Sequence, residues 1–335
     1  MEIVIPARAN LYCILGWKGQ RLVLAWPFIR YREFLWRAIR PLAPDESVGT
    51  DVMVEAGPDC RELVASAWRV LLSTNRADLL TLPHVRAGSE LHSQVSSYPS
   101  IGRAEQLSTA IVPTRGQVDW DTYRKSLPSR SLKELESYKR RLRKEGNISM
   151  FIADFKDFRN IYLIEELFRW KQKWAEKNGK KGNFFSSGYR EFLFRLLKDE
   201  AGTGKFNLFV LALDGRPIAV NLVAVERDTI HGIQAAFDEA YGKFTPGSLL
   251  LEHIVKWAFD SRRDFDFGAG GGKYKTVWAG ESCYSSTDFR ISTSNWGKLA
   301  FVLSDVRRWY RARRFGLVHK GKETQAYRLR SELEP

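Results

Sequence analysis

Short apolar runs separated by tight turns fill residues 206–279 of the chain. Two of these runs, Asn207–Leu213 and Pro217–Val225, flank the dipeptide Asp214-Gly215. Asp-Gly between two β-rich runs is a strong signal for a β-hairpin. Ile230–Phe237 follows as a third apolar run with polar residues at alternate positions, so the pattern predicts three successive strands.

The pattern then changes to helical spacing and back again. Leu249–Phe259 has apolar residues at the period of a helix, and either Ser248 or Thr245 is expected to cap its start. Asp264–Phe267 predicts a further strand, and residues 268–272 after it are glycine-rich. A strand, a glycine-containing turn and a helix N-terminus form an anion-binding site by backbone geometry alone.

Outside this region the pattern alternates between helices and strands, which predicts a mixed α/β (α+β) fold. In the segment that begins at Ser131, this serine is the expected N-cap and Glu134 occupies the capping-box position. The expected helices are Asp59–Ser73, Ser131–Lys144, Phe158–Asn178, Gly188–Asp199 and Trp296–Lys320. The expected strands of the first third are Glu2–Ile5, Leu11–Leu15, Leu22–Ala25, Asp78–Pro83 and Thr109–Pro113.

Composition adds one unusual feature, which is charge. The 335 residues are 44% hydrophobic and 27% charged, typical of a globular protein with room for one large or two ordinary domains. The formal net charge is +14, which indicates an anionic partner: a nucleotide-containing cofactor, nucleic acid, an acidic carrier protein or an anionic membrane. Basic residues gather at the end of two predicted helices, 139–144 and 307–314, where they either complement the helix dipole or contact phosphates or lipid.

Cysteine usage and hydropathy point to the cytoplasm. Cys13, Cys60 and Cys283 are scattered and odd in number, which argues against a disulfide framework or a metal cluster. No apolar run approaches the roughly 20 residues of a membrane span, and the N-terminus lacks the pattern of a signal peptide. We therefore expect a cytoplasmic protein, with peripheral contact at the inner membrane face as a further expectation.

Several catalytic signatures are missing from the sequence. We find no Gly-x-Ser-x-Gly elbow, no His-Glu-x-x-His and no P-loop, and Gly268-x-Gly270 lacks the context of a dinucleotide fingerprint. Cys283 has no recognisable His partner. Direct transfer remains, in which an acceptor amine or hydroxyl attacks a bound thioester or ester. Such a reaction requires an anion cradle, an oxyanion donor and a proton acceptor.

Five short motifs occur in one order and carry a family resemblance. Together they resemble the acetyltransferase domain first associated with bacterial cellulose and exopolysaccharide synthesis, which belongs to the GNAT superfamily and is similar to Fem-type aminoacyltransferases with two GNAT-like domains. The resemblance covers residues 131–279 well and the first third only loosely. The motifs are Leu213–Ala219, Ala236–Asp238, Pro246–Leu251, Asp266–Gly268 and Tyr274–Ala279.

The resemblance implies tandem GNAT-like units with mixed sheets flanked by helices. Residues 1–115 would be a degenerate first unit, residues 116–295 the acyltransferase unit, and residues 296–335 a basic helix and tail. In GNAT enzymes the pyrophosphate of coenzyme A rests on the loop that enters the helix after the central strands. The residues of this chain at that place are Lys243, Phe244, Thr245, Gly247, Ser248 and Leu249.

Candidate catalytic groups lie on or after the central strands. Asp238 is the favoured proton acceptor, with Asp266 and His231 as further candidates, and the alternative for both carboxylates is a role in shaping a turn. Tyr274-Lys275 resembles the Phe-Lys pair of Fem-type enzymes, in which the lysine faces the reacting carbonyl or phosphate. Lys275 is therefore the expected oxyanion donor, unless it is a surface lysine.

The acceptor side of the site is predicted from helix geometry. Aromatic residues at 168, 170 and 174 cannot all share one helix face, so at least one is expected to line a cleft. The loop 179–187 between the two helices is glycine-containing and basic and is expected to cover the site. The expected acceptor-binding residues are Trp170, Lys171, Trp174, Phe237 and Gly268.

The leading hypothesis is an acyltransferase that uses acetyl-CoA, another acyl-CoA or an acyl carrier protein, without a metal, and modifies a sugar or cell-envelope precursor. The first alternative is Fem-like transfer from aminoacyl-tRNA, although the long helical hairpin that Fem-type members often carry for tRNA is not visible in the sequence. The second is a non-enzymatic protein that binds nucleic acid or a membrane surface through its charge. Since no nucleic-acid-binding motif occurs, no stable nucleic-acid partner is expected.

Overall fold

One continuous mixed sheet organises the chain. The computed structural model describes residues 8–42, 49–99, 101–115, 119–179, 187–269 and 272–314. Twelve strands of these residues form the sheet in the order β1-β2-β3-β5-β12-β6-β11-β10-β9-β8-β7, with β4 paired to β2. The strands are β1 (Asn10–Lys18), β2 (Arg21–Glu33), β3 (Trp36–Pro41), β4 (Met53–Val54), β5 (Leu79–Arg86), β6 (Ile101–Val112), β7 (Ile148–Ala153), β8 (Phe206–Leu213), β9 (Arg216–Val225), β10 (Thr229–Phe237), β11 (Asp264–Ala269) and β12 (Cys283–Ser292).

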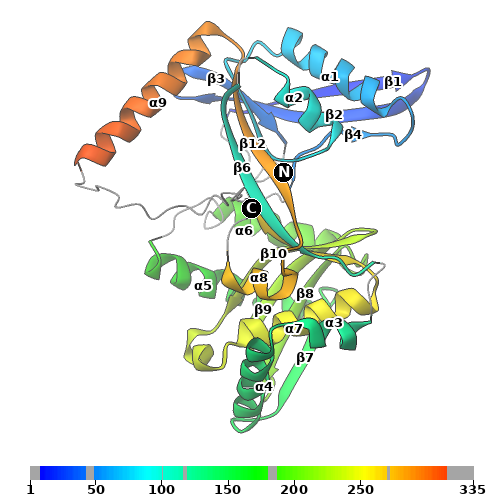
Figure 1. The fold of residues 1–335 in the computed structure, drawn as a ribbon, viewed down its shortest axis with the longest axis vertical. Coiled ribbons are helices and arrows are strands. Elements are labelled where there is room, and N and C mark those ends of the chain that lie inside the picture. The colour runs from blue at the N-terminus through cyan, green and yellow to red at the C-terminus, as the bar shows by residue number, and fades with distance from the viewer. Residues whose placement is uncertain are drawn as a thin grey trace, which may run out of the picture.

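Helices cover this sheet in two groups, one at each end of the molecule (Figure 1). The first group is α1 (Cys60–Thr74) and α2 (Glu90–Ser96), and α9 (Asn295–Arg314) runs along the outside of the same part. The second group is α3 (Trp120–Ser126), α4 (Ser129–Arg143), α5 (Tyr162–Lys177), α6 (Ser187–Asp199), α7 (Pro246–Asp260) and α8 (Lys273–Ala279), with the 3-10 helices η1 (Phe158–Ile161) and η3 (Glu239–Phe244). The architecture is the mixed sheet with flanking helices that the sequence predicts.

Two long strands join the two parts of the molecule. β12 pairs antiparallel with both β5 and β6, and β6 continues the sheet by pairing with β11. Figure 1 shows β6 and β12 running side by side from the upper part to the lower part. A strand near the end of the chain thus completes the sheet of its first third. The unit boundaries expected at residues 115 and 295 remain a prediction, since the sheet continues through both parts.

The predicted hairpin and third strand are confirmed. β8 and β9 pair antiparallel, and the two loop residues between them have positive φ angles, +49° at Asp214 and +79° at Gly215. Positive φ at both central residues is the requirement of a type I′ turn, which explains the Asp-Gly sequence. β10 then pairs antiparallel with β9, with a register shift between Gly232 and Gln234.

Other sequence predictions need correction or lie outside the described residues. α4 begins at Ser129, and its N-cap is Pro128 without a side-chain cap bond, so the predicted Ser131 capping box is wrong. Proline suits a helix start, which lets the helix extend two residues upstream. β7 and β12 are strands that the sequence reading missed. The expected strand Glu2–Ile5, residues 315–320 of the expected final helix and residues 180–186 of the expected loop lie outside the described part.

In the second part of the molecule, helices bury both faces of the sheet. Leu250 and Ile254 of α7 pack with Phe209 and Phe265 in one core, which α4 also enters through Leu142. On the opposite face, α5 and α6 form a second core with β8, β9 and β10, and a third core lies beneath α1 and α2. Because helices cover both faces, α7 is fixed between the sheet and α4, and its N-terminal end is fixed with it.

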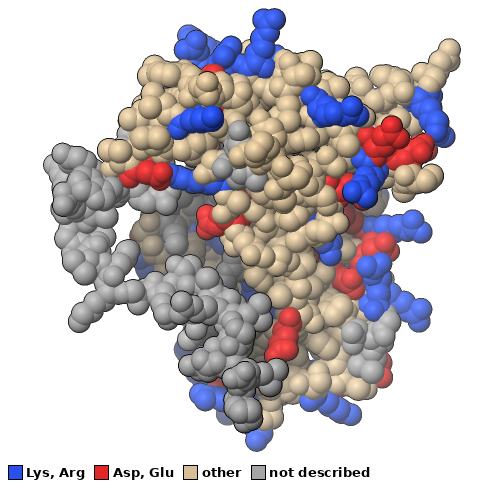
Figure 2. All heavy atoms as spheres, turned by 45° about the horizontal axis from the view of Figure 1, so that its top comes forward, with Lys and Arg blue, Asp and Glu red and all other residues tan. Residues whose placement is uncertain are grey.

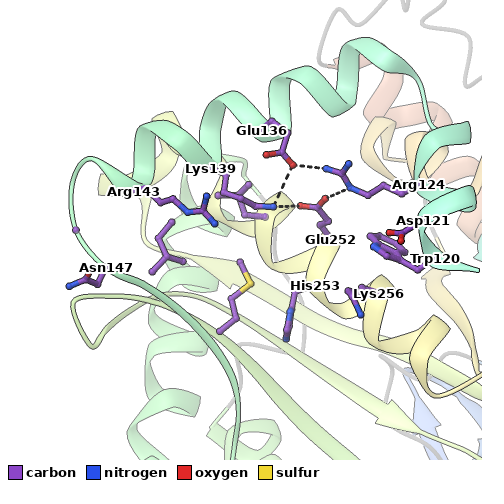
Figure 3. A pocket seen from close by; sticks show the side chains of 14 residues that line it. Trp120, Asp121, Arg124, Glu136, Lys139, Arg143, Asn147, Glu252, His253 and Lys256 are labelled. Carbon is purple, nitrogen blue, oxygen red and sulfur yellow. Dashed lines mark hydrogen bonds and ion pairs between the residues drawn. The ribbon is translucent and has the colours of Figure 1, made fainter.

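An ion-pair network fastens α7 to the helices above it (Figure 3). Glu252 of α7 is buried, and it accepts hydrogen bonds from Arg124 of α3 at 2.8 Å and from Lys139 of α4 at 3.1 Å. Glu136 of α4 pairs with the same two cations. The network borders a polar cavity of about 860 Å³. Each buried charge in it has an opposite partner, as burial of a charge requires.

We expect Glu252→Ala to lower the free energy of unfolding by roughly 2–3 kcal/mol, because it leaves two cations without their buried partner. The Arg124 and Lys139 side chains are 27% and 23% exposed, which keeps the loss below that of a fully buried pair. The control is Glu134→Ala, which removes an exposed pair with Arg130 and should cost less than about 1 kcal/mol. Urea unfolding of both variants measures the difference, and equal losses would contradict a fastening role for Glu252.

Candidate active site

The candidate site is a cavity of about 570 Å³ at the place where β10 and β11 separate. These parallel strands pair only from Thr229–Asp264 to His231–Asp266. Gly232 to Phe237 of β10 and Phe267 of β11, which lie beyond that point, line the cavity together with Phe265 from the paired stretch. α5, the start of α7 and the start of α8 complete its walls. A gap between two parallel strands, closed by a helix N-terminus, gives a ligand access to both strand backbones.

The cavity brings together nine of the residues that the sequence predicts as a site. Three come from α5, one from β10, three from the start of α7 and two from α8. They are Trp170, Lys171, Trp174, Phe237, Thr245, Gly247, Ser248, Tyr274 and Lys275. The other predicted residues do not line it. They are Asp238, His231, Asp266, Lys243, Phe244, Leu249 and Gly268.

The start of α7 offers few free donors. Thr245 is the N-cap in a left-handed conformation, with φ +48°, and neither its side chain nor that of Ser248 makes the predicted cap bond. The amides of Ser248 and Leu249 donate to the Thr245 carbonyl at 2.9 and 3.3 Å, and Pro246 has no amide hydrogen. Among the described residues the Gly247 amide has no hydrogen bond, and the buried Thr245 hydroxyl has none either. These two groups are the donors left for an anion.

Three of the predicted loop residues hold the loop rather than line the cavity. Phe244 and Leu249 are buried in the core beneath α7. Lys243 is exposed, with its Nζ 3.6 Å from Glu145 and 4.7 Å from the centre of the Phe244 ring. Their proposed contact with a cofactor stays a prediction. What the structure establishes is that apolar anchors fix the loop on both sides of Gly247.

Lys275 is buried beside the cavity, so its alternative interpretation as a surface lysine is wrong. Its ammonium donates to the carbonyl oxygens of Phe267 at 3.1 Å and Gly268 at 2.8 Å. Burial lowers the pKa of Lys275, while the nearby Asp266 carboxylate opposes that shift. Gly268 has φ +70°, a conformation that favours glycine and that turns the strand toward this lysine. The end of β11 is therefore built around the Lys275 ammonium.

α5 places a second lysine and two indole rings in the cavity. Phe168 packs in the core, whereas Trp170 and Trp174 line the cavity, which confirms that the three aromatic residues do not share one face. The Lys171 Nζ lies 4.9 Å from the centre of the Trp174 ring and 3.5 Å from the Ala235 carbonyl. Burial lowers the pKa of Lys171. Trp174 is 41% exposed, so it forms a rim that a ligand can reach.

Asp266 lies at the point where β10 and β11 separate, but it is not among the residues that line the cavity. Its carboxylate accepts hydrogen bonds from the Tyr284 hydroxyl at 2.6 Å and the Gly268 amide at 2.7 Å, and it lies 3.4 Å from His231 Nδ1. Burial acts to raise the pKa of Asp266, but these contacts outweigh it and hold the pKa below its ordinary value. An ionised, fully engaged carboxylate fits a positioning role, and its role as a proton acceptor stays a prediction.

His231 shares this network. Burial favours its neutral form, but the carboxylates of Asp266 and Glu226 outweigh burial and raise the pKa of His231. Asp238, the favoured base, caps η3 by accepting from the Ala240 amide at 3.1 Å and pairs with Arg216 at 3.2 Å. These contacts match the turn-forming alternative for Asp238, and its catalytic role stays untested.

The sequence reading missed several polar residues of the cavity. Asn221 of β9 is buried and lines the cavity. Gln234 of β10 and Glu239 of η3 also line it. Asn221 left a signal, since it is a lone amide within the apolar run Pro217–Val225. A buried amide in a central strand requires a polar neighbour or a ligand. Glu239 is the one carboxylate among the lining residues, and Lys177 pairs with it at 3.3 Å.

The chemistry available in the cavity is therefore cationic and apolar. Two partly desolvated ammonium groups share the cavity with several aromatic rings, and among the described lining residues the one carboxylate, Glu239, is already paired. This combination suits a ligand with an anionic part and an apolar or flat part. In the described part of the chain no cluster of three or more His, Cys, Asp or Glu residues has a geometry that fits a metal ion.

The His231–Asp266 pair predicts a pH dependence of stability. Because the pKa of His231 is raised in the folded state, its contribution is present below its ordinary pKa of 6.5 and disappears as pH rises through the raised value. We expect His231→Gln to lose most stability below pH 6.5 and progressively less above it. Asp266 titrates below its ordinary value of 3.8 and so does not enter this window.

The matched control is His253→Gln. Burial and then Lys256 lower the pKa of His253, so the wild-type residue disfavours the folded state when it becomes protonated. Relative to the wild type, this variant should gain stability as pH falls below 6.5. Urea unfolding across the pH range measures both trends, and parallel curves for the two variants would contradict the assigned ion pair.

Comparison with known proteins finds a family similarity in the second part of the chain. Residues 129–276 match the family model described as "Acetyltransferase (GNAT) domain". This match covers α4 to α8 and therefore every element that lines the cavity. A search of curated protein sequences found no match.

Solved structures share the fold over most of the chain. FemX superposes with a TM-score of 0.60 and 12% identity, over 88% of this chain and 90% of FemX. L-PGS from Bacillus licheniformis gives a TM-score of 0.53 and 13% identity, over 87% of each chain. The C-terminal domain of a proposed lysylphosphatidylglycerol synthetase from Agrobacterium fabrum gives 0.56 and 11%, over 88% of each chain. Residues 129–276 are thus similar to a GNAT acetyltransferase domain, and they lie within a larger fold that the chain shares with FemX.

Proposed function

We propose that the chain is an acyl-CoA-dependent N- or O-acyltransferase that modifies a sugar or another precursor of the cell envelope or of an exopolysaccharide. The observation that carries the proposal is the cavity between β10 and β11. There a helix N-terminus, a buried lysine and an aromatic rim, all within or beside the GNAT domain, face one space. The helix N-terminus suits the anion cradle and the buried lysine suits the oxyanion donor that direct transfer requires, and the aromatic rim suits the acceptor; no covalent enzyme intermediate is needed.

The donor would bind with its pyrophosphate at the start of α7. The Gly247 amide and the Thr245 hydroxyl are free to donate there. The acyl thioester would extend along β10 into the space between the strands, where the backbone of Gly232–Phe237 lines the cavity. Since the strands do not pair in this stretch, backbone groups of β10 are available to the extended donor.

The transfer step is a single displacement. The acceptor nitrogen or oxygen forms a bond to the thioester carbonyl carbon, the carbon–sulfur bond breaks, and coenzyme A leaves as a thiolate that takes up a proton. The Lys275 ammonium, which is held by two carbonyl oxygens, would stabilise the negative charge on the carbonyl oxygen as it develops. Its lowered pKa also suits it to supply the proton to the leaving thiolate.

The acceptor would enter past Trp174 and Phe237. These aromatic side chains are 41% and 37% exposed, and flat apolar surfaces of this kind suit the apolar face of a sugar ring. Lys171 lies beside Trp174 and can contact a phosphate of a nucleotide-linked acceptor. Asp238 lies outside the lining residues, so as the proton acceptor it would act through water.

An aminoacyl-tRNA donor is the second candidate, and one observation favours it. Within the described part of the chain, the start of α7 keeps a single free backbone amide, because Pro246 lacks one and two others are bonded to Thr245. This is a sparse cradle for a pyrophosphate. The lysines and aromatic rings of the cavity suit a terminal adenosine equally well. The choice between the donors depends on binding measurements.

The partners and location follow from the same proposal. An acyl carrier protein can replace coenzyme A as the donor, and no stable nucleic-acid partner is expected for the thioester route. The proposed location is the cytoplasm, with peripheral contact at the inner face of an anionic membrane. Among the described residues, no helix has the length and apolar character that crossing a bilayer requires.

Acetyl-CoA should raise the melting temperature of the wild type by a few degrees, since a ligand at a hundredfold excess over its Kd adds roughly 2.7 kcal/mol. Gly247→Val should abolish the shift, because a branched side chain blocks approach to the Gly247 amide. A Cβ at this position lies 3.5 Å from Phe237 Cδ1, an ordinary contact, so the variant should fold.

The control for this experiment is Gly57→Val, at a glycine whose Cβ position is open. Its melting temperature should respond to acetyl-CoA as the wild type does. A full shift in folded Gly247→Val would place the donor elsewhere. A shift with aminoacyl-tRNA and none with acetyl-CoA would favour the second candidate.

Lys275→Met should lower kcat about 100-fold or more while the Kd of the donor changes little, because the ammonium acts on the oxyanion of the transition state. Methionine keeps a similar volume but leaves the carbonyl oxygens of Phe267 and Gly268 without this donor, so the melting temperature of the variant is measured beside kcat to show that it is folded. The control is Lys256→Met on α7, where Nζ pairs with Asp260 at the surface. Free thiol release with amino-sugar acceptors measures both variants, and wild-type kcat in Lys275→Met would refute the assignment.

A further inference from the structure

The hairpin between β2 and β3 exposes two large apolar residues at its tip. β2 and β3 pair up to Glu33–Trp36, which leaves Phe34 and Leu35 as a two-residue turn. Phe34 is 74% exposed and Leu35 is 65% exposed. Phe34 also has φ +59°, a conformation that is rare for a bulky residue and that costs about 1 kcal/mol or more. Glycine or asparagine would adopt this turn at a lower cost, so the chain keeps a bulky, exposed side chain here at some expense of stability.

α9 turns its apolar residues away from the sheet. The side that faces the sheet carries Phe301, which is close to Gly102, and Asp305, which pairs with Arg103. At 100° per residue, a separate apolar stripe roughly 120° wide lies on the other side of the helix. Every member of that stripe is between 40% and 55% exposed: Trp296, Leu299, Val302, Leu303 and Val306.

The hairpin tip and the α9 stripe form one surface. The Trp36 indole donates to the Trp296 carbonyl at 2.9 Å, and the two rings lie 5.9 Å apart. Figure 1 shows that α9 begins beside β3 at one end of the molecule and runs outward from there. An exposed Phe, an exposed Leu, two indole rings and an aliphatic helix stripe are thus adjacent. Exposed apolar surface of this extent marks an interaction site.

The charges around this surface select the partner. Among the described residues, the acidic groups of β2 and α9 are paired, Glu33 with Arg290 and Asp305 with Arg103. Asp78, which precedes β5, is paired with Arg37 of β3. Arg32 and Lys298 beside the apolar residues are exposed cations. The sequence of the last turns of α9 adds Arg307, Arg308, Arg311, Arg313 and Arg314. Figure 2 shows Lys and Arg side chains spread over one face and along its upper edge, not gathered into a single patch.

From this geometry we propose that the β2–β3 tip and the outer stripe of α9 dock the protein on an anionic lipid bilayer. Phe34 and Leu35 enter the acyl boundary, Trp36 and Trp296 lie at the level of the headgroups, and the exposed Arg32 and Lys298 contact lipid phosphates. The inference deepens the membrane contact named in the proposed function by assigning the surface that makes it. It places the cavity of the lower part away from the bilayer surface, at the other end of β6 and β12 (Figure 1).

The test is a flotation assay with vesicles of phosphatidylcholine and phosphatidylglycerol. The double variant Phe34→Gly, Leu35→Ser should bind at least about tenfold more weakly, because it removes two side chains that would be buried in lipid. Its melting temperature should hold or rise, because glycine suits the first position of this turn. Loss of binding therefore cannot reflect misfolding. Binding of the wild type should fall steeply with salt and be weak on pure phosphatidylcholine.

The matched control is Phe151→Ser on β7, an exposed aromatic residue on the opposite edge of the sheet, and it should bind like the wild type. Equal binding by the double variant and the wild type would overturn the proposal, as would a wild type that fails to bind anionic vesicles. A concentration-dependent dimer that the double variant abolishes would assign the surface to a second copy instead. The acetyl-CoA melting shift needs no membrane, so it reports separately on the proposed function.

Discussion

A single buried carboxylate holds together the part of the fold in which the cavity opens. Asp266 accepts hydrogen bonds from Tyr284 of β12 and from the Gly268 amide, and it lies beside His231 of β10. It does so at the last pair of β10 and β11, directly before those strands separate. Three strands are therefore tied at one point. These contacts offset the free energy that is lost beyond it, where β10 and β11 do not pair. Because β12 also pairs with β5, the same point couples the cavity to the other part of the sheet.

The sequence predicts local structure well wherever one short-range cause is sufficient. The Asp214-Gly215 turn needs positive φ at both residues, and few other dipeptides supply it, so the hairpin of β8 and β9 follows directly. β12 was missed because its partners β5 and β6 are about 200 residues earlier in the chain, and no local pattern reveals such a pairing. The start of α4 was misplaced for a local reason, because Pro128 outweighs Ser131, the serine that resembles a cap.

The site was predictable in its location but not in its roles. Trp170, Trp174 and Gly247 were found because helix geometry and glycine turns have consequences that are visible in sequence. Whether a carboxylate faces the cavity depends on how β10 twists after His231, and the strand places Asp238 outside the lining residues. Asn221 shows the opposite case, because its burial beside the cavity is a tertiary fact although the amide itself interrupts an apolar run. The hydrogen bonds from Lys275 to carbonyl oxygens were likewise not predictable from the sequence, because they depend on the tertiary fold.

The electrostatics of the cavity explain why it should be occupied during function. Burial lowers the pKa values of Lys171 and Lys275, so each ammonium is held at a cost to the folded state. Carbonyl oxygens of Ala235, Phe267 and Gly268 compensate part of that cost, but they carry only partial charges. The nearby carboxylates are committed to other partners, Asp266 to Tyr284 and His231, and Glu239 to Lys177. An anionic ligand or a developing oxyanion in the cavity would compensate this cost further, and its stabilisation rises with the charge it brings.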